Sequence, residues 1–195
     1  MTVASDRERI LSHGLGVASA HGLDALSIGE LARKLDVERS GLTLHFASKA
    51  SLQLGVLEQA ASMFQHDVVA VAQRAPQGVE RMRALFVGWI GWSLNPRLKG
   101  GCPFVHASNE SDSLPINVRK KLREFLNQWS ALLEEAIAEA KQTGSFSREV
   151  DGEQLIFEIY GLYLSHHFWH WSMKDANARA RTMISFNRLM KNAIR

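Results

Sequence analysis

Two pairs of residues have the types and the spacing that chemistry at a protein site requires. Cys102 and His106 stand four apart in GGCPFVHASNES, and a Cys–His pair can act as nucleophile and base. His166 and His170 in SHHFWHW are also four apart, which places two imidazoles on one helical face, where they can bind a metal. The SHHFWHW segment contains no Asp or Glu that could complete a metal site, and the Cys–His pair has no third orienting group that the sequence identifies.

Ordinary packing explains both pairs more simply. The glycine pair and the proline around Cys102 predict a tight turn into a short helix, with Cys102 as a small buried residue. The tryptophans beside His166 and His170 predict a packed helix. We therefore expect no catalytic residue, no metal site and no cofactor. A thiol-sensing or metal-sensing regulator that uses Cys102 or His166 and His170 remains an alternative, and so does a Cys–His enzyme.

A third group of residues, in VERSGLTLHFASK, has the chemistry of nucleic-acid contact. The guanidinium of Arg39 has the fork that fits a guanine edge, and Glu38 can accept from a cytosine amine. Lys49 follows Ser48, where a helix is expected to begin. A cation is locally unfavourable at the positive end of a helix dipole. A DNA phosphate bound at the same place would explain the lysine.

Helices must position these residues. Ser27 and Glu30 have the S-x-x-E spacing of a capping box, and the apolar residues at 28, 31, 32 and 35 repeat with a helical period. This helix should end near Leu35, and Asp36 can adopt the left-handed conformation of a tight turn. A short helix from about 38 to 44 would complete a helix-turn-helix, whose second helix can enter a major groove.

The remaining periodic segments also predict helices. Residues 6–20 form the first of these, and Ser48 should cap a long helix that ends at Pro76. The later helices are expected at 77–94, 103–110, 116–142, 151–172 and 176–193. Fourteen of the 16 aromatic residues follow residue 75. We predict an all-α fold with a helix-turn-helix domain at 1–48 and a helical domain at 49–195, in which 49–75 is a connecting helix.

Composition limits the classes of function. The chain has 195 residues, 46% of them hydrophobic, and a net charge of +3. Residues 1–60 contain six Lys/Arg against seven Asp/Glu, so DNA binding must rest on local placement of charge and not on a basic domain. The single cysteine excludes an internal disulfide. The sequence lacks an apolar run of the ~18 residues that a membrane span needs, and the start MTVASDRERI is charged. We expect a cytoplasmic protein without a membrane partner.

The run LSIGELARKLDVERSGLTLHFASKASL, residues 26–52, resembles the TetR family of bacterial transcriptional regulators. The family pattern is matched in order and spacing by Leu31-Ala32, Val37, Leu42, His45-Phe46 and Ser48-Lys49. The sequence departs from it at Asp36, Glu38, Ser40 and Thr43, which stand where Gly, a capping Ser, Gly and Tyr are common. We therefore expect somewhat unusual DNA contacts. The resemblance implies a homodimer that binds double-stranded operator DNA, most often a repressor, released by a small apolar or aromatic effector.

The resemblance also implies where the sites lie. Contacts to DNA are expected from Ser27, Arg39, Ser40, Gly41, Thr43, His45 and Lys49. A dimer surface on 116–142 and 151–172 would include Leu122, Trp129, Leu133, Ile137, Tyr160, Tyr163 and Leu164. An effector pocket would include Phe86, Trp89, Trp92, Cys102, Phe104, Trp129 and Phe168. These apolar stripes can equally well face the core of a single chain, and a structural protein with a vestigial DNA-binding head remains a further alternative.

Overall fold

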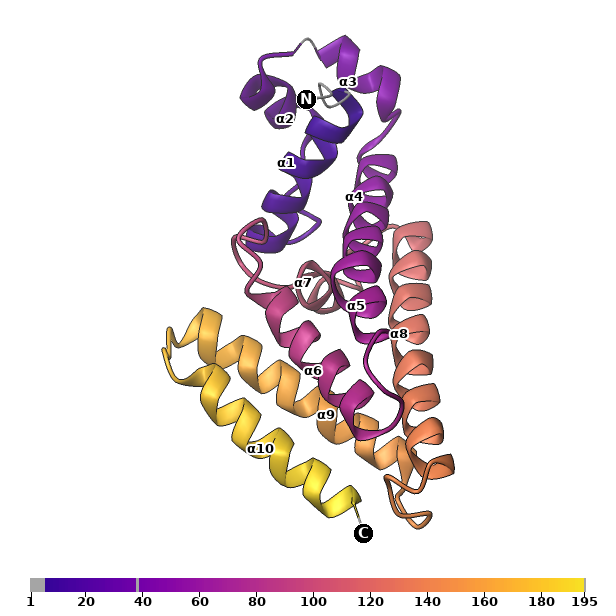
Figure 1. Ribbon diagram of the computed structural model, residues 1–195. Coiled ribbons are helices and arrows are strands. Elements are labelled where there is room, and N and C mark those ends of the chain that lie inside the picture. Colours follow the sequence, from indigo (N-terminus) through magenta and orange to yellow (C-terminus); the bar gives the residue numbers. More distant parts are fainter. Residues whose placement is uncertain (1–5, 38, 195) are drawn as a thin grey trace. The chain divides into compact units, whose positions relative to one another are not determined.

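The computed structural model describes residues 6–37 and 39–194, and for residues 39–41 it describes the backbone only. Every regular element in this part of the chain is a helix (Figure 1). The α-helices are α1 (Asp6–His21), α2 (Ile28–Leu35), α3 (Arg39–His45), α4 (Lys49–Phe64), α5 (Ala70–Ala72), α6 (Val79–Ser93), α7 (Pro103–Asn109), α8 (Ile116–Gln142), α9 (Gly152–His167) and α10 (Ala178–Ala193). Two π-helical segments, η1 (Gln65–Val69) and η2 (Phe168–Ser172), continue α4 and α9. The predicted all-α class is confirmed.

Helix starts and stops follow the local signals in the sequence. The hydroxyl of Ser27 accepts a hydrogen bond from the Glu30 backbone N–H at 3.4 Å and caps α2. The chain turns into α3 at Asp36, which has φ 52° and ψ 47°. Before α4, the hydroxyl of Ser48 accepts from the Ser51 backbone N–H at 3.1 Å. The caps at Ser27 and Ser48 and the predicted left-handed turn are therefore confirmed, and the reciprocal contact of the Glu30 side chain stays a prediction.

Packing divides the chain into two compact units. The first consists of Met1–Met63 with Asn95–Phe125, and the second of Phe64–Leu94 with Leu126–Arg195. Both α4 and α8 continue from one unit into the other. The functional domains predicted at 1–48 and 49–195 are a different division of the chain, and they stay a prediction.

The first unit has an aliphatic core built from α1 to α4. Its buried members include Ile10, Leu11, Leu15, Leu26, Leu31, Leu42, Phe46, Leu52 and Val56. Gly55 allows the Phe46 ring to lie against α4, since a Cβ at this position would be 2.9 Å from the ring. Gly100, in the loop before α7, lies against the backbone of Ser19 and Ala20 with no room for a Cβ. The end of α1 is therefore held directly against that loop.

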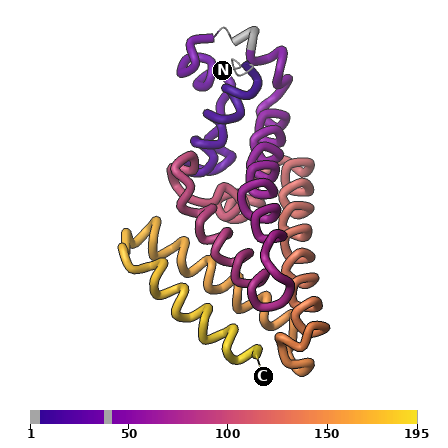
Figure 2. Tube along the Cα trace, in the orientation of Figure 1, coloured from indigo at the N-terminus to yellow at the C-terminus, as the bar shows by residue number. Residues whose placement is uncertain are grey.

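The second unit has an aromatic core. The Phe86 ring of α6 stacks on Phe186 of α10 with 4.1 Å between the centroids, and Trp89 stacks on Tyr163 of α9 at 3.9 Å. Helices α9 and α10 lie side by side, as the orange and yellow segments of Figure 2 show. In the first turn of α6, Arg81 forms a largely buried ion pair with Glu139, in which Nη1 lies 2.8 Å from Oε2.

Most predicted helices lie within two residues of the observed ones, and α8 has the predicted bounds of 116–142. Two predictions were wrong in detail. The connecting helix does not continue unbroken to Pro76, because the backbone becomes π-helical at Gln65 and the last α-turn ends at Ala72. The helix predicted at 151–172 becomes π-helical at Phe168. In the described part of the chain, no helix is both long and apolar enough to cross a membrane.

Candidate nucleic-acid interface

The recognition helix α3 has one buried face and one exposed face. Leu42 and Phe46, four residues apart, are buried against the first unit, and this spacing fixes the orientation of the helix. Thr43, Leu44 and His45 are exposed, as expected for residues between them. Leu44 is 86% exposed, the highest value among the large apolar side chains that are exposed in the described part of the chain.

Four of the predicted contacts belong to the segment 38–41. Glu38 lies outside the described residues, and of Arg39, Ser40 and Gly41 the structure describes the helical backbone alone. Their roles in base and phosphate contact therefore stay predictions. Leu44 was missed by the sequence reasoning, although a signal was available. An apolar residue midway between two buried positions of a helix must point away from the core.

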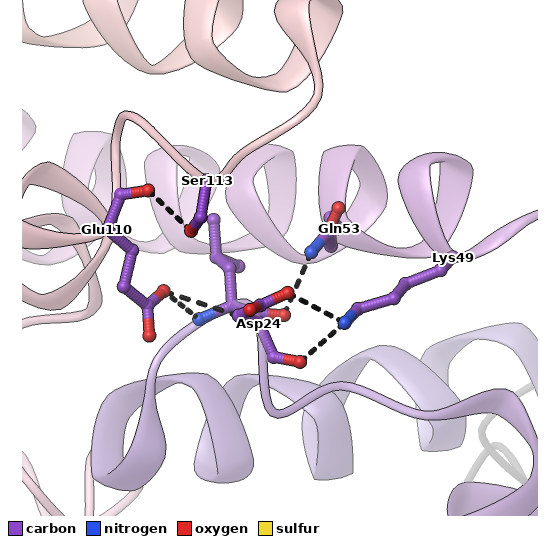
Figure 3. A network of polar contacts seen from close by, with 6 residues as sticks. Asp24, Lys49, Gln53, Glu110 and Ser113 are labelled. Atoms are coloured by element: carbon purple, nitrogen blue, oxygen red, sulfur yellow. Dashed lines mark hydrogen bonds and ion pairs between the residues drawn. The ribbon is translucent and has the colours of Figure 1, made fainter.

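Lys49 is tied to the loop between α1 and α2 (Figure 3). Its Nζ lies 2.8 Å from Oδ1 of Asp24 and donates to the backbone carbonyl oxygen of Asp24 at 2.6 Å. Both side chains are about half exposed, 46% for Lys49 and 56% for Asp24. This pair gives a second reason for a lysine at the start of α4. The predicted phosphate contact is not tested by it, because the ammonium has three donors.

The same loop is held by two further side chains (Figure 3). The Glu110 carboxylate at the end of α7 accepts from the backbone N–H of Leu23 at 2.8 Å and of Asp24 at 3.3 Å. The buried amide of Gln53 donates to the Leu23 carbonyl at 3.0 Å. Gly22 has φ 85°, and a Cβ there would overlap the Glu110 carboxylate. Two elements, α4 and α7, thus fix the loop that leads into α2.

The two residue pairs considered for chemistry are placed as packed groups. Cys102 is buried at the N-cap of α7, with 2% of its surface exposed, and a thiol so enclosed has poor access to oxidants or substrates. His106 donates from Nε2 to the Gly100 carbonyl at 3.3 Å. The His166 and His170 rings stack with centroids 5.7 Å apart. The described residues contain no cluster of three or more potential metal ligands.

Burial sets the protonation of His166. Its side chain is fully buried, and its pKa is lowered to about 4, first by this burial, then by the charges of His170 and, less, Arg179. The nearby backbone of Ala178 acts in the opposite direction, but neither ring nitrogen of His166 has a hydrogen-bond partner within the described chain. At neutral pH the ring is therefore uncharged.

The aromatic residues predicted for an effector pocket are spread over both units. In the second unit, Trp89 meets Trp129 edge to face at 5.0 Å, and Phe64 meets Trp92 and Trp129 at 5.4 and 4.9 Å. The buried indole N–H of Trp129 has no hydrogen-bond partner within the described chain. Other predicted members lie elsewhere: Cys102 and Phe104 belong to the first unit, Phe86 stacks on Phe186, and Phe168 is 52% exposed.

The residues predicted for a dimer surface are mostly core residues of one chain. Those already buried are Leu122, Trp129, Leu133, Ile137 and Tyr163. Leu164 is 48% exposed, and the hydroxyl of the half-buried Tyr160 lies 3.3 Å from that of Ser130. The second unit does expose other large apolar side chains, among them Phe157, Phe168, Trp169, Met173 and Ile184.

Comparison with known proteins accounts for this arrangement. A family model described as bacterial regulatory proteins, tetR family, matches residues 10–55. A second, described as the tetracyclin repressor-like C-terminal domain, matches 78–186, more than half of the chain. The chain belongs to the TetR family. It is therefore a transcriptional regulator of the kind that binds operator DNA and small-molecule effectors, and TetR regulators are in general not enzymes.

Solved structures show the same fold across the whole chain. A TetR transcriptional regulator from Chloroflexus aurantiacus J-10-FL is 20% identical, with a TM-score of 0.83 over 95% of this chain and 92% of that one. The ketosteroid transcriptional regulator KstR2 of Mycobacterium tuberculosis is 15% identical, with a TM-score of 0.75 over 100% and 97%. AibR, solved with isovaleryl coenzyme A and operator DNA, is 20% identical, with a TM-score of 0.74 over 97% and 98%. No curated protein sequence matches the chain.

Proposed function

We propose that this TetR-family protein is a repressor whose α3 reads base edges in the major groove and whose operator is released by a small molecule. The observation that carries the proposal is the geometry of α2 and α3. The left-handed turn at Asp36 joins the two helices, and the burial of Leu42 and Phe46 directs Thr43, Leu44 and His45 outward. A helix held this way by its partner is suited to enter a groove.

Leu44 is the residue that gives this helix a testable base preference. An apolar side chain that is 86% exposed gains nothing from the fold. Against DNA, the matching partner in the major groove is the methyl group of thymine. We assign Leu44 a thymine contact, beside the guanine contact predicted for Arg39. Ser27 and Lys49, which stand at helix starts, would position the duplex through phosphates.

The proposed effector is an apolar or aromatic molecule with a hydrogen-bond acceptor. The cluster of Phe64, Trp89, Trp92 and Trp129 in the second unit supplies the apolar surface. The unpaired indole N–H of Trp129 is costly to bury without an acceptor, by about 1–3 kcal/mol. An effector that supplied the acceptor would bind a rearranged cluster more tightly than the packed one, and it could thereby shift the conformation. AibR, solved with isovaleryl coenzyme A and operator DNA, supports the coarser part of the proposal, a regulator that binds both DNA and a small molecule.

The proposed dimer surface is an exposed row on α9 that continues to the first residue of η2. Phe157, Gly161, Leu164 and Phe168 follow at intervals of four, three and four residues, so they share one helical face. The three large side chains are 75%, 48% and 52% exposed. A Cβ at Gly161 would meet no atom within 4 Å, so this face is open at its centre. Two copies of the row can pack on each other across a two-fold axis, which replaces the buried residues of the earlier expectation.

The test begins with duplex fragments that the protein retains from its own genome. A repressor should select a two-fold site and bind it in a salt-dependent way. Replacing the thymine read by Leu44 with deoxyuridine should weaken wild-type binding roughly fourfold, the value of one methyl group. The same replacement should leave the duplex affinity of the Leu44→Ala variant unchanged. As a control, Val71→Ala, at an exposed valine of the second unit, should respond like the wild type.

Two results would count against the proposal. Equal affinity for selected and scrambled duplexes at physiological salt would remove sequence reading. Operator release by highly charged metabolites alone, with apolar acceptors inactive in the same assay, would remove the effector assignment. For the second point, Trp129→Phe keeps the ring and loses the N–H, so it should weaken binding of an active acceptor roughly tenfold.

A further inference from the structure

A long groove in the first unit follows one face of α1. It is bounded by residues of α1 between Glu8 and His21, by the end of α2, by Gln59 and Met63 of α4, and by the loop before α7. Its volume is about 830 Å³, which lies in the range of small-molecule sites. Gly16 lies in its wall, and a Cβ there would meet no atom within 4 Å. None of the described residues of α3 lines the groove.

The groove collects positive charge. Its basic residues are Arg9, His13, His21, Lys34, Arg97 and Lys99. Glu8 is the one carboxylate among the lining residues that the structure describes. With the histidines counted as neutral, four Arg/Lys and one carboxylate give the groove a net charge of +3. This equals the net charge of the whole chain. Arg9 is partly neutralised by Asp6, 3.2 Å away at the surface. The other cations come from the end of α2 and from the loop before α7.

Two of these charges act on the same side chain, His13. His13 is half-buried in the wall of the groove. Its pKa is lowered by burial and, next, by the charges of Lys34 and Lys99. The two lysines lie far apart in the sequence, yet both act on one imidazole. Like charges brought together in this way favour an anion between them.

The walls also include apolar surface. Leu15 and Val17 of α1, Leu35 of α2 and Met63 of α4 line the same groove. A bare inorganic ion would leave this surface in contact with water. A ligand with charged and apolar ends would use both kinds of wall.

We propose that this groove binds an organic polyanion of about nucleotide size, with its phosphates at Lys34, Lys99 and His13 and its apolar part at Leu15 and Met63. The site lies apart from the outward face of α3 and involves none of the aromatic cluster of the second unit. It therefore adds a ligand to the operator and the effector of the proposed function. Testing this groove therefore requires neither the operator nor the effector.

The experiment uses the full chain without DNA, at constant ionic strength and without divalent metal. ATP and inorganic pyrophosphate are titrated while the His13 ring is followed by NMR over a pH series. We expect saturable 1:1 binding of ATP, a rise in the His13 pKa on binding, and weaker binding of pyrophosphate. Lys34→Ala and Lys99→Ala should each weaken ATP binding roughly tenfold, the value of a charge-assisted hydrogen bond. Lys120→Ala, at an exposed lysine of α8, should leave the ATP affinity unchanged.

A second pair of variants separates the groove from general charge effects. Gly16→Asp places a carboxylate in the open wall and should abolish ATP binding. Gly29→Asp adds the same charge at a glycine of α2 that is equally free of neighbours, and it should bind ATP nearly as the wild type does. Equal binding by both variants, an unchanged His13 pKa at ATP saturation, or equal affinity for ATP and pyrophosphate would each overturn the proposal. A Lys99→Ala protein that loses duplex affinity but keeps ATP affinity would also overturn it, in favour of a DNA contact.

Discussion

The ammonium of Lys49 lies 2.8 Å from the carboxylate of Asp24 and 2.6 Å from its carbonyl oxygen, so the first residue of α4 is bonded to the loop that leads into α2. A cation at a helix start is unfavourable toward the helix dipole, and the contact with Asp24 offsets this. The pair also places the ammonium beside the segment where a phosphate is expected. Structural support and phosphate binding therefore make different predictions for Lys49 and Asp24.

The first prediction concerns this pair. Lys49→Ala should lower the free energy of unfolding by about 1 kcal/mol, since both partners are half exposed. If Lys49 also binds a phosphate, the same change should weaken all duplexes alike and reduce the salt slope of binding by about 1. Asp24→Ala frees the ammonium, so it should cost similar stability without weakening DNA binding. Urea unfolding and fluorescence anisotropy at several salt concentrations measure the two effects. Equal losses of DNA affinity in both variants would leave Lys49 a purely structural role.

The second prediction concerns Glu110, which holds the same loop from α7. Glu110→Ala removes the acceptor of the buried Leu23 N–H and should lower the free energy of unfolding by about 1–3 kcal/mol. Glu110→Gln retains a carbonyl oxygen and should cost less. Gly22→Ala should be at least as harmful as Glu110→Ala, because it combines a positive φ with overlap on the carboxylate. Urea denaturation of the three variants gives this order, and a fully stable Gly22→Ala protein would contradict the packing described here.

Local signals predicted much of this fold because they act within a few residues. The Ser27 cap, the Asp36 turn and the bounds of α8 required no knowledge of tertiary contacts. The left-handed Gly144 that ends α8 belongs to the same class. The π-helical segment η1 could not be predicted in this way, because its sequence QHDVV carries no pattern that distinguishes a π-helical from an α-helical register.

For the site residues, too, features set by neighbouring residues were predicted and features set by distant contacts were not. Thr43 and His45 were predicted to contact DNA, and both are exposed because Leu42 and Phe46 fix the face of α3. The partner of Lys49 could not be predicted, since Asp24 is 25 residues away. The apolar stripes of α8 and α9 are wide enough for a core and for an interface, so only burial could assign Leu133 and Tyr163 to the core. The basic groove was missed because its cations come from separate segments of a unit that is not basic overall.

The third prediction concerns association of two chains through α9. Phe157→Glu places a charge at the most exposed position of the proposed row, and in a two-fold dimer each change occurs twice. The dissociation constant of the dimer should rise roughly 100-fold or more, from the lost burial of two aromatic side chains. Sedimentation velocity over a range of concentrations measures it. Val71→Glu, at an exposed valine elsewhere in the second unit, is the matched control and should leave the association unchanged. If both variants associate like the wild type, α9 is not the interface.

The fourth prediction concerns the pH dependence of stability that His166 imposes. Its pKa is lowered to about 4 in the folded chain, first by burial, then by the charge of His170, against about 6.5 when unfolded. Between these values the unfolded state binds more protons, so the free energy of unfolding must fall as pH falls. The contribution is complete above pH 6.5, and the loss reaches on the order of 2–3 kcal/mol near pH 4. Urea unfolding at pH 7.5 and 4.5 should show a smaller loss for His166→Phe than for the wild type. His13 also has a lowered pKa, but it is present in both proteins and cancels in the difference. Equal losses would show that His166 is solvated and protonates freely in the folded state.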